Sequence, residues 1–390
     1  VSGQINGTTI EREGLMQNGR AAERSYGSSG VAKFLGGGGK ATLSWRINPS
    51  TVLTLNSSYQ REAPLAYNSF VANRIKNDFV HGLSTEGIFN NELSYSLTTA
   101  RFTARLSGYY TRFTDQVEQT AFYNDSEARF TYLTMRGVEK EHYGIEAAAI
   151  WNVTSALSFT FIGSMGDALY TNNPYATITY ESQDEVSMTY TNPVTKKQDA
   201  LLVIADGCRV SSTPLTALSL GIDYNVNGWF FGANVNYYDR VYVDFSEFRR
   251  LSNILTPYIS SGAVDANGNP SFGVDEATLA TNGGILYNED GSIYKAQTAE
   301  QTRVKGGFLV DLNVGRYIRL KNGRSLSLNL TVNNLLNNTN MSTGGYEQNR
   351  GDYYYDNGEQ GDARTYVFSK NPKLYYANAF NAFFNVAYKF

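Results

Sequence analysis

Residues 377–390 read ANAFNAFFNVAYKF, and this closing stretch guides the interpretation of the whole chain. Side chains of a β-strand point alternately to its two faces, so residues of one parity share a face. One face of this stretch would carry Phe380, Ala382, Phe384, Val386, Tyr388 and Phe390. Strict alternation with so many aromatic side chains is typical of a strand whose outer face meets lipid and whose inner face meets water. An edge strand of a soluble sheet is the alternative.

The composition favours strands joined by tight turns. Aromatic residues make up 14% of the chain, with 29 Tyr, 36 Gly and only 8 Pro, a mixture that suits strands better than helices. No run approaches the roughly 18 apolar residues of a membrane-spanning helix, so a membrane role would have to use strands. A chain of 390 residues would allow two or three soluble domains, but a barrel of this length folds as one unit. We therefore expect residues 1–390 to form one barrel portion.

Charge and reactive residues argue against several classes of function. The net charge is -3 and the Lys and Arg residues are scattered, which argues against a nucleic-acid partner. The single cysteine, Cys208, is expected to be an incidental loop thiol. His81 and His142 show neither metal-ligand spacing nor a nucleophile motif around them, so we predict no enzyme activity, metal or cofactor. No export signal is visible before Val1, so we expect a mature fragment or one whose upstream part has been removed.

A hairpin unit recurs along the chain, with short turns and long loops in strict alternation. Residues such as Asn48-Pro49-Ser50-Thr51 are the types that a β-turn requires. Five tight turns and six long loops are predicted, the loops including 13–39, 62–89, 169–213, 244–305 and 338–376. Twelve strands are predicted near residues 1–12, 42–47, 53–60, 93–97, 102–110, 143–151, 157–165, 218–224, 229–237, 308–320, 326–332 and 379–390.

This alternation predicts an antiparallel transmembrane β-barrel. All turns would lie at one end and all loops at the other, as in outer-membrane barrels with short periplasmic turns. The polar sides of the strands carry Ser, Thr, Asn, Gly and Gln, which are costly to bury in a dry interior, so the apolar sides must face outward. The three tryptophans, Trp45, Trp151 and Trp229, each lie within three residues of a tight turn, which predicts an aromatic girdle at the membrane surface.

One charged residue occupies a predicted lipid-facing position. Arg316 shares the parity of Val314 and Ile318 in its strand. It lies only five residues before Lys321, so its long side chain is expected to extend to the turn-side interface. A charge there costs about 0 to 1 kcal/mol, against about 2 to 4 kcal/mol at the bilayer midplane.

Three stretches resemble a known family. Residues 332–338, VNNLLNN, and 385–390, NVAYKF, resemble the closing segments of TonB-dependent outer-membrane receptors. Residues 105–116, RLSGYYTRFTDQ, resemble a strand and loop entry of the middle of such a barrel. Within the family the chain is most similar to the large Bacteroidota receptors, including the SusC-like group. The resemblance extends over essentially all 390 residues, and the last sixty or so carry its specific motifs.

The resemblance implies active import across a Gram-negative outer membrane. Such receptors have about 22 strands around an amino-terminal plug, through which the TonB-ExbB-ExbD complex delivers energy. No plug or TonB box is recognisable here, so the resemblance implies the carboxyl-terminal half of a receptor, with its carboxyl end in the periplasm. It also implies that Tyr388 and Phe390 serve as the insertion signal for the barrel-assembly machinery, and that a SusD-like surface lipoprotein is a possible partner.

Candidate ligand-binding residues lie in the outer loops. The run Asp352-Tyr353-Tyr354-Tyr355-Asp356 combines stacking faces with carboxylates suited to a sugar or peptide, although a solvated loop with self-packed tyrosines is the alternative. Asp239 and Arg240, at the top of a strand, would line the lumen or pair with each other's neighbours. Residues 265–269, DANGN, begin like a calcium loop but lack its Glu, and Asp290-Gly291 resembles a hairpin turn, so turns are predicted at both places.

Two other classes of function remain open. A complete twelve-stranded barrel would act as a passive channel or an outer-membrane enzyme, since an even strand number allows closure. A soluble β-rich adhesin or sugar-binding protein would need no membrane. Within the favoured reading, glycan, peptide, siderophore and vitamin importers share the same wall, so the cargo is not predicted.

Overall fold

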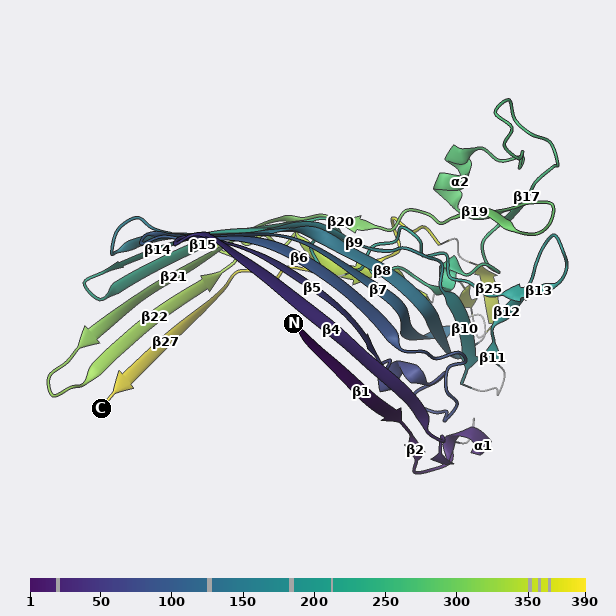
Figure 1. Cartoon of the computed structure of the whole chain (residues 1–390), viewed down its shortest axis with the longest axis horizontal. Helices are drawn as coiled ribbons and strands as arrows, with labels where there is room; N and C mark the ends of the chain where they lie inside the picture. The colour runs from purple at the N-terminus through teal and green to yellow at the C-terminus, as the bar shows by residue number, and fades with distance from the viewer. Residues whose placement is uncertain are drawn as a thin grey trace.

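The computed structural model describes residues 1–18, 22–124, 128–181, 186–211, 213–349, 353–356, 359–363 and 366–390. One antiparallel sheet dominates it, and its main path contains twelve strands, each paired with its neighbour (Figure 1). The strands in path order are β1 (Ser2–Ile10), β4 (Ala32–Asn48), β5 (Thr51–Glu62), β6 (Glu86–Thr98), β7 (Phe102–Asn124), β8 (Arg129–Asn152), β9 (Leu157–Tyr170), β14 (Thr216–Val226), β15 (Trp229–Asp239), β21 (Gly307–Arg319), β22 (Ser325–Asn333) and β27 (Asn381–Lys389). The predicted all-β antiparallel fold and its twelve strands are confirmed.

Two predicted loops are partly strands in the structure. Gly36 to Gly39 belong to β4, not to a loop, and pair with Gly3 to Asn6 of β1. A Cβ on Gly38 would lie 2.6 Å from the carbonyl oxygen of Tyr59, so this close approach of two strands needs glycine. The segment between the predicted fifth and sixth strands is also strand, because β7 and β8 pair as far as Asn124 and Arg129.

The five tight turns lie at one end of the sheet and the long connections at the other (Figure 1). Two of the turns are Asn-Gly pairs with both residues at positive φ: Asn227 and Gly228 at 48° and 80°, and Asn322 and Gly323 at 62° and 75°. This conformation matches the twist of the flanking strands, and Asn and Gly tolerate it best. The turn chemistry thereby sets the register of the β14–β15 and β21–β22 hairpins.

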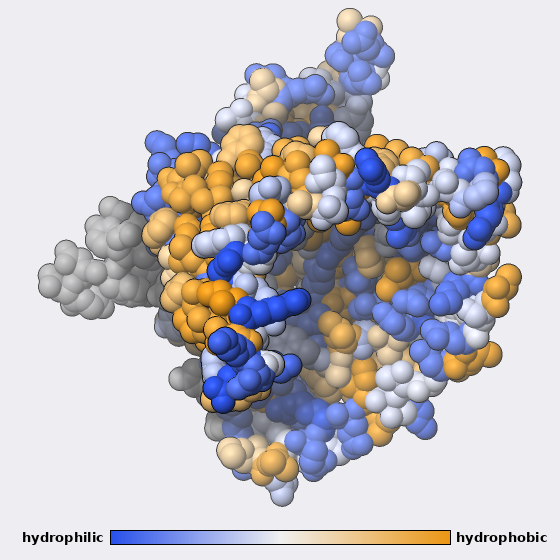
Figure 2. Space-filling model, turned by 90° about the vertical axis from the view of Figure 1, so that its left-hand side faces the viewer, coloured by the Kyte–Doolittle hydropathy of each residue, from blue (hydrophilic) through white to orange (hydrophobic). Residues whose placement is uncertain are grey.

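The strand register places the predicted apolar rows on one face of the sheet. Leu328 pairs with Val386 and Leu330 with Phe384, so these side chains share a face across β22 and β27. Apolar side chains of this face are strongly exposed, with Leu43 at 70%. Figure 2, which looks onto the turn end, shows hydrophobic residues around the outside of a hollow, curved sheet. The rows therefore do not meet each other across a dry interior.

The opposite face carries polar side chains that bond to one another across strands. Thr42 donates to Asn56 at 2.8 Å, and Ser219 donates to Asn236 at 2.7 Å. Asn236 in turn donates to Asp311 at 3.0 Å. A wall with such cross-strand bonds is suited to a water-filled lumen.

The sheet remains open. Within the described residues, β1 pairs only with β4 and β27 only with β22, so the main path ends in two unpaired edges. The two chain ends lie apart at these edges (Figure 1). The twelve strands form a curved wall and do not close into a barrel of their own.

Most buried apolar residues lie at the loop end, in a region that we call the outer cap: residues 169–215, 240–306 and 338–377 with the outer parts of β7 and β8. Its main cluster includes Leu133, Val203, Cys208, Phe245 and Leu251.

The short strands beside the main path are β2 (Glu13–Gly14), β3 (Gly27–Ser28), β10 (Tyr175–Tyr180), β11 (Val186–Ser187), β12 (Thr189–Thr191), β13 (Gln198–Ala200), β16 (Val241–Tyr242), β17 (Pro257–Ile259), β18 (Gly284–Tyr287), β19 (Ile293–Gln297), β20 (Arg303–Val304), β23 (Ser342–Tyr346), β24 (Tyr353–Asp356), β25 (Glu359–Ala363) and β26 (Lys373–Tyr376). The helices are α1 (Ala22–Ser25), α2 (Glu276–Asn282) and the 3₁₀ turns η1 (Ala66–Ser69) and η2 (Phe248–Arg250). Among the residues described, no helix has the length and apolar character needed to cross a membrane.

Candidate ligand site in the outer cap

The three predicted girdle tryptophans lie on the outward face near the turn end. Trp45, Trp151 and Trp229 are all exposed, and each shares the parity of the apolar row in its strand. Trp229 stacks on Phe231 with ring centres 5.9 Å apart. Their contact with a membrane surface stays a prediction.

Arg316 reaches the turn end, as expected from its position in the sequence. Its Nη1 donates to the carbonyl oxygen of Asn227 at 2.6 Å, and its guanidinium carbon lies 4.9 Å from the centre of the Trp229 ring. The guanidinium therefore lies beside the β14–β15 turn, away from the middle of the apolar row.

A second aromatic row lies on the same outward face near the outer cap, and sequence reasoning did not single it out. It consists of three cross-strand pairs, Tyr59 with Phe89, Tyr110 with Tyr143, and Tyr237 with Phe308. Tyr143 precedes Trp151 by eight residues on β8, or roughly 26 Å along the strand at about 3.3 Å per residue. Because strands of such barrels tilt, this spacing fits an apolar band of about 25 Å or less. The sequence contained the information needed to find this aromatic row, because each of its residues has the same parity as the apolar row predicted for its strand.

Asp239 and Arg240 both form ion pairs at the loop end of the sheet, and their place in the lumen stays a prediction. Asp239 shares the outward parity of Tyr237 and accepts a hydrogen bond from Arg303 at 2.7 Å. Arg240 donates to the carboxylate of Asp167 at 3.0 Å. Both residues thus pair with charged neighbours, as in the alternative given above.

The tyrosine run predicted to bind ligand is only partly described. Asp352 lies outside the described residues. The backbone of Tyr353 to Asp356 forms β24, which pairs with β25, but the side chains of Tyr353, Tyr354, Tyr355 and Asp356 also lie outside the description. Their role stays a prediction.

The remaining sequence candidates are structural. Backbone amides of Asn267 and Asn269 donate to the Asp265 carboxylate, which confirms a turn, and Asp290 caps the hairpin between β18 and β19. Cys208 is buried in the outer cap, and burial raises the pKa of its thiol. Within the described part of the chain, no cluster of His, Cys, Asp and Glu is placed to hold a metal ion.

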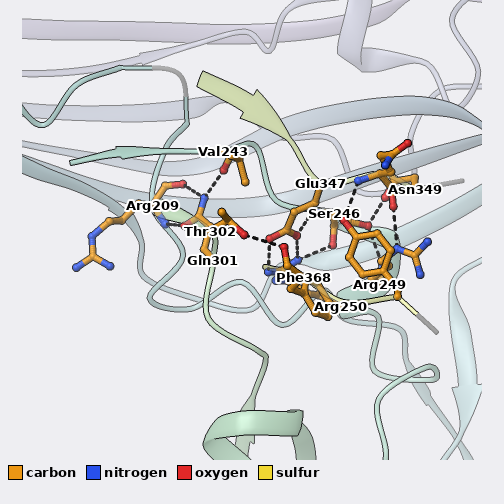
Figure 3. A network of polar contacts seen from close by, with 12 residues as sticks. Arg209, Val243, Ser246, Arg249, Arg250, Gln301, Thr302, Glu347, Asn349 and Phe368 are labelled. Carbon is orange, nitrogen blue, oxygen red and sulfur yellow. Dashed lines mark hydrogen bonds and ion pairs between the residues drawn. The ribbon is translucent and has the colours of Figure 1, made fainter. Parts of the chain in front are cut away.

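A buried ion pair organises the outer cap (Figure 3). Arg250 from η2 donates to Glu347 through both terminal guanidinium nitrogens, with Nη2 to Oε1 at 3.1 Å, and both side chains are fully buried. The Ser246 amide donates to the same carboxylate at 2.9 Å. The Arg250 guanidinium carbon also lies 4.9 Å from the centre of the Phe368 ring. The pair thus joins the loop after β16 to the segment after β23.

Further polar contacts in Figure 3 fix the same loops. Gln301 accepts a hydrogen bond from the Arg209 amide at 2.7 Å and donates to the carbonyl oxygens of Arg209 and Val243. The Thr302 hydroxyl donates to the carbonyl oxygen of Phe368 at 2.9 Å. Four loop segments are held together by these bonds, so the cap is an ordered support for a binding site.

Beside the ion pair lies a cavity of about 530 Å³. Its walls come from the outer ends of β7 and β8, the loop after β16, and the segments around β23 and β26. Aromatic rings line it, including Phe122 and the Tyr346–Tyr375 pair, whose ring centres are 6.2 Å apart. Asp244 and Glu247 place carboxylates in the same lining. A cavity of this volume with apolar walls and a few polar groups is suited to a small ligand.

The electrostatics of the cavity are unusual for two surface-loop acids. Burial raises the pKa of Glu247 to about 8, and the charges of Asp244 and Glu118 act in the same direction. The pKa of Asp244 is also raised, mainly by desolvation. Sequence reasoning missed both residues, because the only signal was the length of the loop that contains them.

Comparison with known proteins adds the family context. The sequence profile described as "TonB dependent receptor-like, beta-barrel" matches residues 24–335. The structure is similar to the copper transporter OprC, with a TM-score of 0.54 and 11% identity over 98% of this chain and 44% of that chain. A search of curated protein sequences found no significant match.

Two further similar structures are named as receptors. The ferric-catecholate import receptor Fiu from K12 E. coli has a TM-score of 0.47 and 13% identity, over 92% of this chain and 35% of that chain. The ferric enterobactin receptor PfeA from Pseudomonas aeruginosa has a TM-score of 0.47 and 11% identity, over 92% and 41%. The chain therefore spans less than half the length of each of these proteins.

Proposed function

The chain belongs to the TonB-dependent receptor-like β-barrel family, and from this membership we propose that it forms the barrel part of an outer-membrane importer of a nutrient ligand. The observation that carries the proposal is the wall itself: its strands place apolar rows on one face and polar rows on the other, as in the β4–β5 and β22–β27 pairs. This arrangement suits a protein that contacts acyl chains outside and encloses water inside. In this proposal the barrel wall anchors the protein in the membrane, and the outer cap contacts the ligand.

We further propose that these strands are the carboxyl-terminal part of a larger barrel of about 22 strands. The unpaired edges at β1 and β27 support this, because exposed strand edges with free backbone groups are unfavourable in a bilayer. The chain's coverage of only 44% of OprC also supports it. The remaining strands and the plug would lie on the same or another chain.

The partners follow from the same proposal. The bilayer surrounds the wall, and the TonB-ExbB-ExbD complex acts through the plug. The barrel-assembly machinery would recognise the last strand, where the rings of Tyr388 and Phe390 pack 4.8 Å apart between their centres. The resemblance of the closing motifs to SusC-like Bacteroidota receptors supports a SusD-like lipoprotein above the outer cap. The carboxyl end would then lie in the periplasm, at the turn side.

The proposal is tested by topology and energy dependence together. An epitope inserted at Gly268, in an exposed outer-cap turn, should be labelled on intact cells, whereas one inserted at Asn322, in a tight turn, should be labelled only after the outer membrane is opened. Uptake of the nutrient that depends on this gene should also stop when TonB is removed. Uptake that persists without TonB would favour a passive channel, and protein recovered only from the soluble fraction would favour an adhesin or sugar-binding protein.

A further inference from the structure

The outer-cap cavity is lined by aromatic rings and by two acids, Asp244, which is exposed, and Glu247, which is half-buried. Tyr346 and Tyr375 come from neighbouring strands, β23 and β26, and are 42% and 55% exposed, so their rings are available to a ligand that enters from outside. Phe122 and Phe130 extend the aromatic lining from the wall side. The faces of aromatic rings carry partial negative charge and attract cations, most strongly where water is excluded.

The carboxylates of the lining outnumber the cations that are free to pair with them. Arg250 is occupied by Glu347, and Lys140 is occupied by Glu118. Arg249, on the same 3₁₀ turn, directs its guanidinium to the Tyr366 ring, 3.8 Å from its centre. Two acids, Asp244 and Glu247, therefore have no cationic partner among the described residues.

The cations that act on these two acids are already paired with other carboxylates. The charge of Arg250 lowers the pKa of Glu247 and that of Lys140 lowers the pKa of Asp244, but Arg250 pairs with Glu347 and Lys140 with Glu118. Ser211 donates its hydroxyl to Asp244 at 3.1 Å. On the wall side Glu118 adds a negative charge that raises the pKa of both acids, and it accepts a hydrogen bond from the Tyr170 hydroxyl at 2.8 Å. With both acids ionised, the cavity carries two carboxylates that have no ion-pair partner of their own among the described residues. A ligand that brings positive charge would remove this imbalance.

We propose that this cavity binds an organic cation, an amine or quaternary ammonium group, between the Tyr346–Tyr375 pair and the carboxylates of Asp244 and Glu247. The inference deepens the proposed function and rests on it, because this cation would be the group by which the outer cap recognises its nutrient. Aromatic walls favour an organic cation, since its alkyl surface packs against the rings while its charge is attracted to them.

The site couples cation binding to proton release. Because the pKa of Glu247 is about 8, the acid is mostly protonated at neutral pH in the empty cavity. A bound cation favours the carboxylate, so Glu247 gives its proton to the solvent as the cation enters. The affinity for the cation therefore increases by up to tenfold for each unit by which the pH rises toward the pKa of Glu247. Above that pKa the affinity levels off.

The test uses phenyltrimethylammonium, whose charge does not change with pH, and its neutral isostere tert-butylbenzene. Binding is measured by isothermal titration calorimetry between pH 6 and pH 9 on the receptor isolated from outer membranes. We expect the cation to bind with an affinity that rises with pH and levels off near the pKa of Glu247, while the neutral probe binds more weakly at every pH. Equal binding of the two probes, or no cation binding at any pH, overturns the proposal.

Three variants locate the site. Glu247→Gln should remove the pH dependence, and Tyr375→Leu should weaken cation binding several-fold without changing that dependence. Glu276→Gln is the matched control, because this acid lies on α2 with a side chain 92% exposed, and it should behave as the native protein. If the Glu247→Gln variant does not fold, Asp244→Asn is tested in its place. This substitution should lower the affinity for the cation at least tenfold. Native pH dependence in Glu247→Gln, or unchanged affinity in Asp244→Asn, contradicts the assignment.

Failure of the cation site can be distinguished from failure of the proposed importer function. TonB-dependent uptake with no cation binding would leave the importer standing and remove only the cation site. Cation binding without TonB-dependent uptake would retain the site as a property of the outer cap and remove the importer.

Discussion

The Arg316 guanidinium lies 4.9 Å from the centre of the Trp229 ring, directly across the pairing of β21 with β15. It is a charge on an otherwise apolar row, and it is tolerated because it reaches the backbone of the Asn227 turn. The pair therefore marks the level at which the outward face changes from apolar to interfacial.

Moving this charge along the same row should be costly. Leu312→Arg places a guanidinium on the outward face in the middle of β21, where it should lower the free energy of unfolding by about 2 to 4 kcal/mol. Arg316→Leu should change it by less than about 1 kcal/mol. Urea titration in lipid vesicles measures both. The matched control is Asn313→Arg on the inward face, and destabilisation there equal to that of Leu312→Arg would contradict the assigned parity.

Breaking the buried ion pair should loosen the outer cap. Glu347→Gln leaves the Arg250 charge buried without its partner, and we expect a loss of about 3 to 5 kcal/mol in the stability of the cap. Replacing both residues, as Arg250→Met with Glu347→Leu, should recover much of this loss. Hydrogen exchange of the Ser246 and Leu251 amides reports on local opening. As a control, Asp78→Asn breaks the exposed pair with Arg24 and should cost less than about 1 kcal/mol.

The stability of the outer cap should depend on pH through Glu247. The pKa in the folded protein, about 8, lies above the ordinary value of 4.5, so folding favours the protonated acid. The stabilising contribution is therefore fully present below pH 4.5 and is lost as the pH rises toward 8. Asp244, whose pKa is also raised, acts in the same direction. Protease resistance of the cap at pH 5 should exceed that at pH 9, and Glu247→Gln should reduce this difference.

The terminal aromatic should matter for assembly more than for the finished wall. Phe390 is 93% exposed and adds little packing, so its deletion should leave the stability of assembled protein nearly unchanged. Because Phe390 is proposed to be an insertion signal, its deletion should nevertheless lower the outer-membrane yield of the protein markedly. Quantitative immunoblots of membrane fractions measure this, with Phe390→Tyr as the control that keeps an aromatic end. A native yield after deletion would remove the role.

Much of the wall was readable from the sequence because period-two alternation and turn chemistry are local properties. The residues around Leu43, Leu55 and Phe384 identify both a strand and its outward face without knowledge of any partner strand. The extension of β7 and β8 to Asn124 and Arg129 was missed, because bulges between Phe113 and Val117 interrupt the alternation.

The site was less predictable, because it depends on contacts between distant loops. Glu247 and Glu347 are separated by 100 positions, and no local pattern indicates that Glu347 pairs with Arg250 while Glu247 has no ion-pair partner among the described residues. Asp239 and Arg240 show another case. Their position at the top of a strand suggested a lumen site, but no local pattern indicated that Asp239 pairs with Arg303 and Arg240 with Asp167. Burial and partner choice are set by the assembled cap.

The orientation of the wall is tested most directly by paired cysteine labels on β21. Leu312→Cys and Asn313→Cys are each introduced with Cys208→Ser, labelled with a fluorophore, and measured in vesicles that contain brominated lipids. The register predicts strong quenching by the brominated acyl chains at position 312 and strong quenching by aqueous iodide at position 313. The reverse pattern, or equal quenching at both positions, would contradict an outward apolar face and with it the membrane wall.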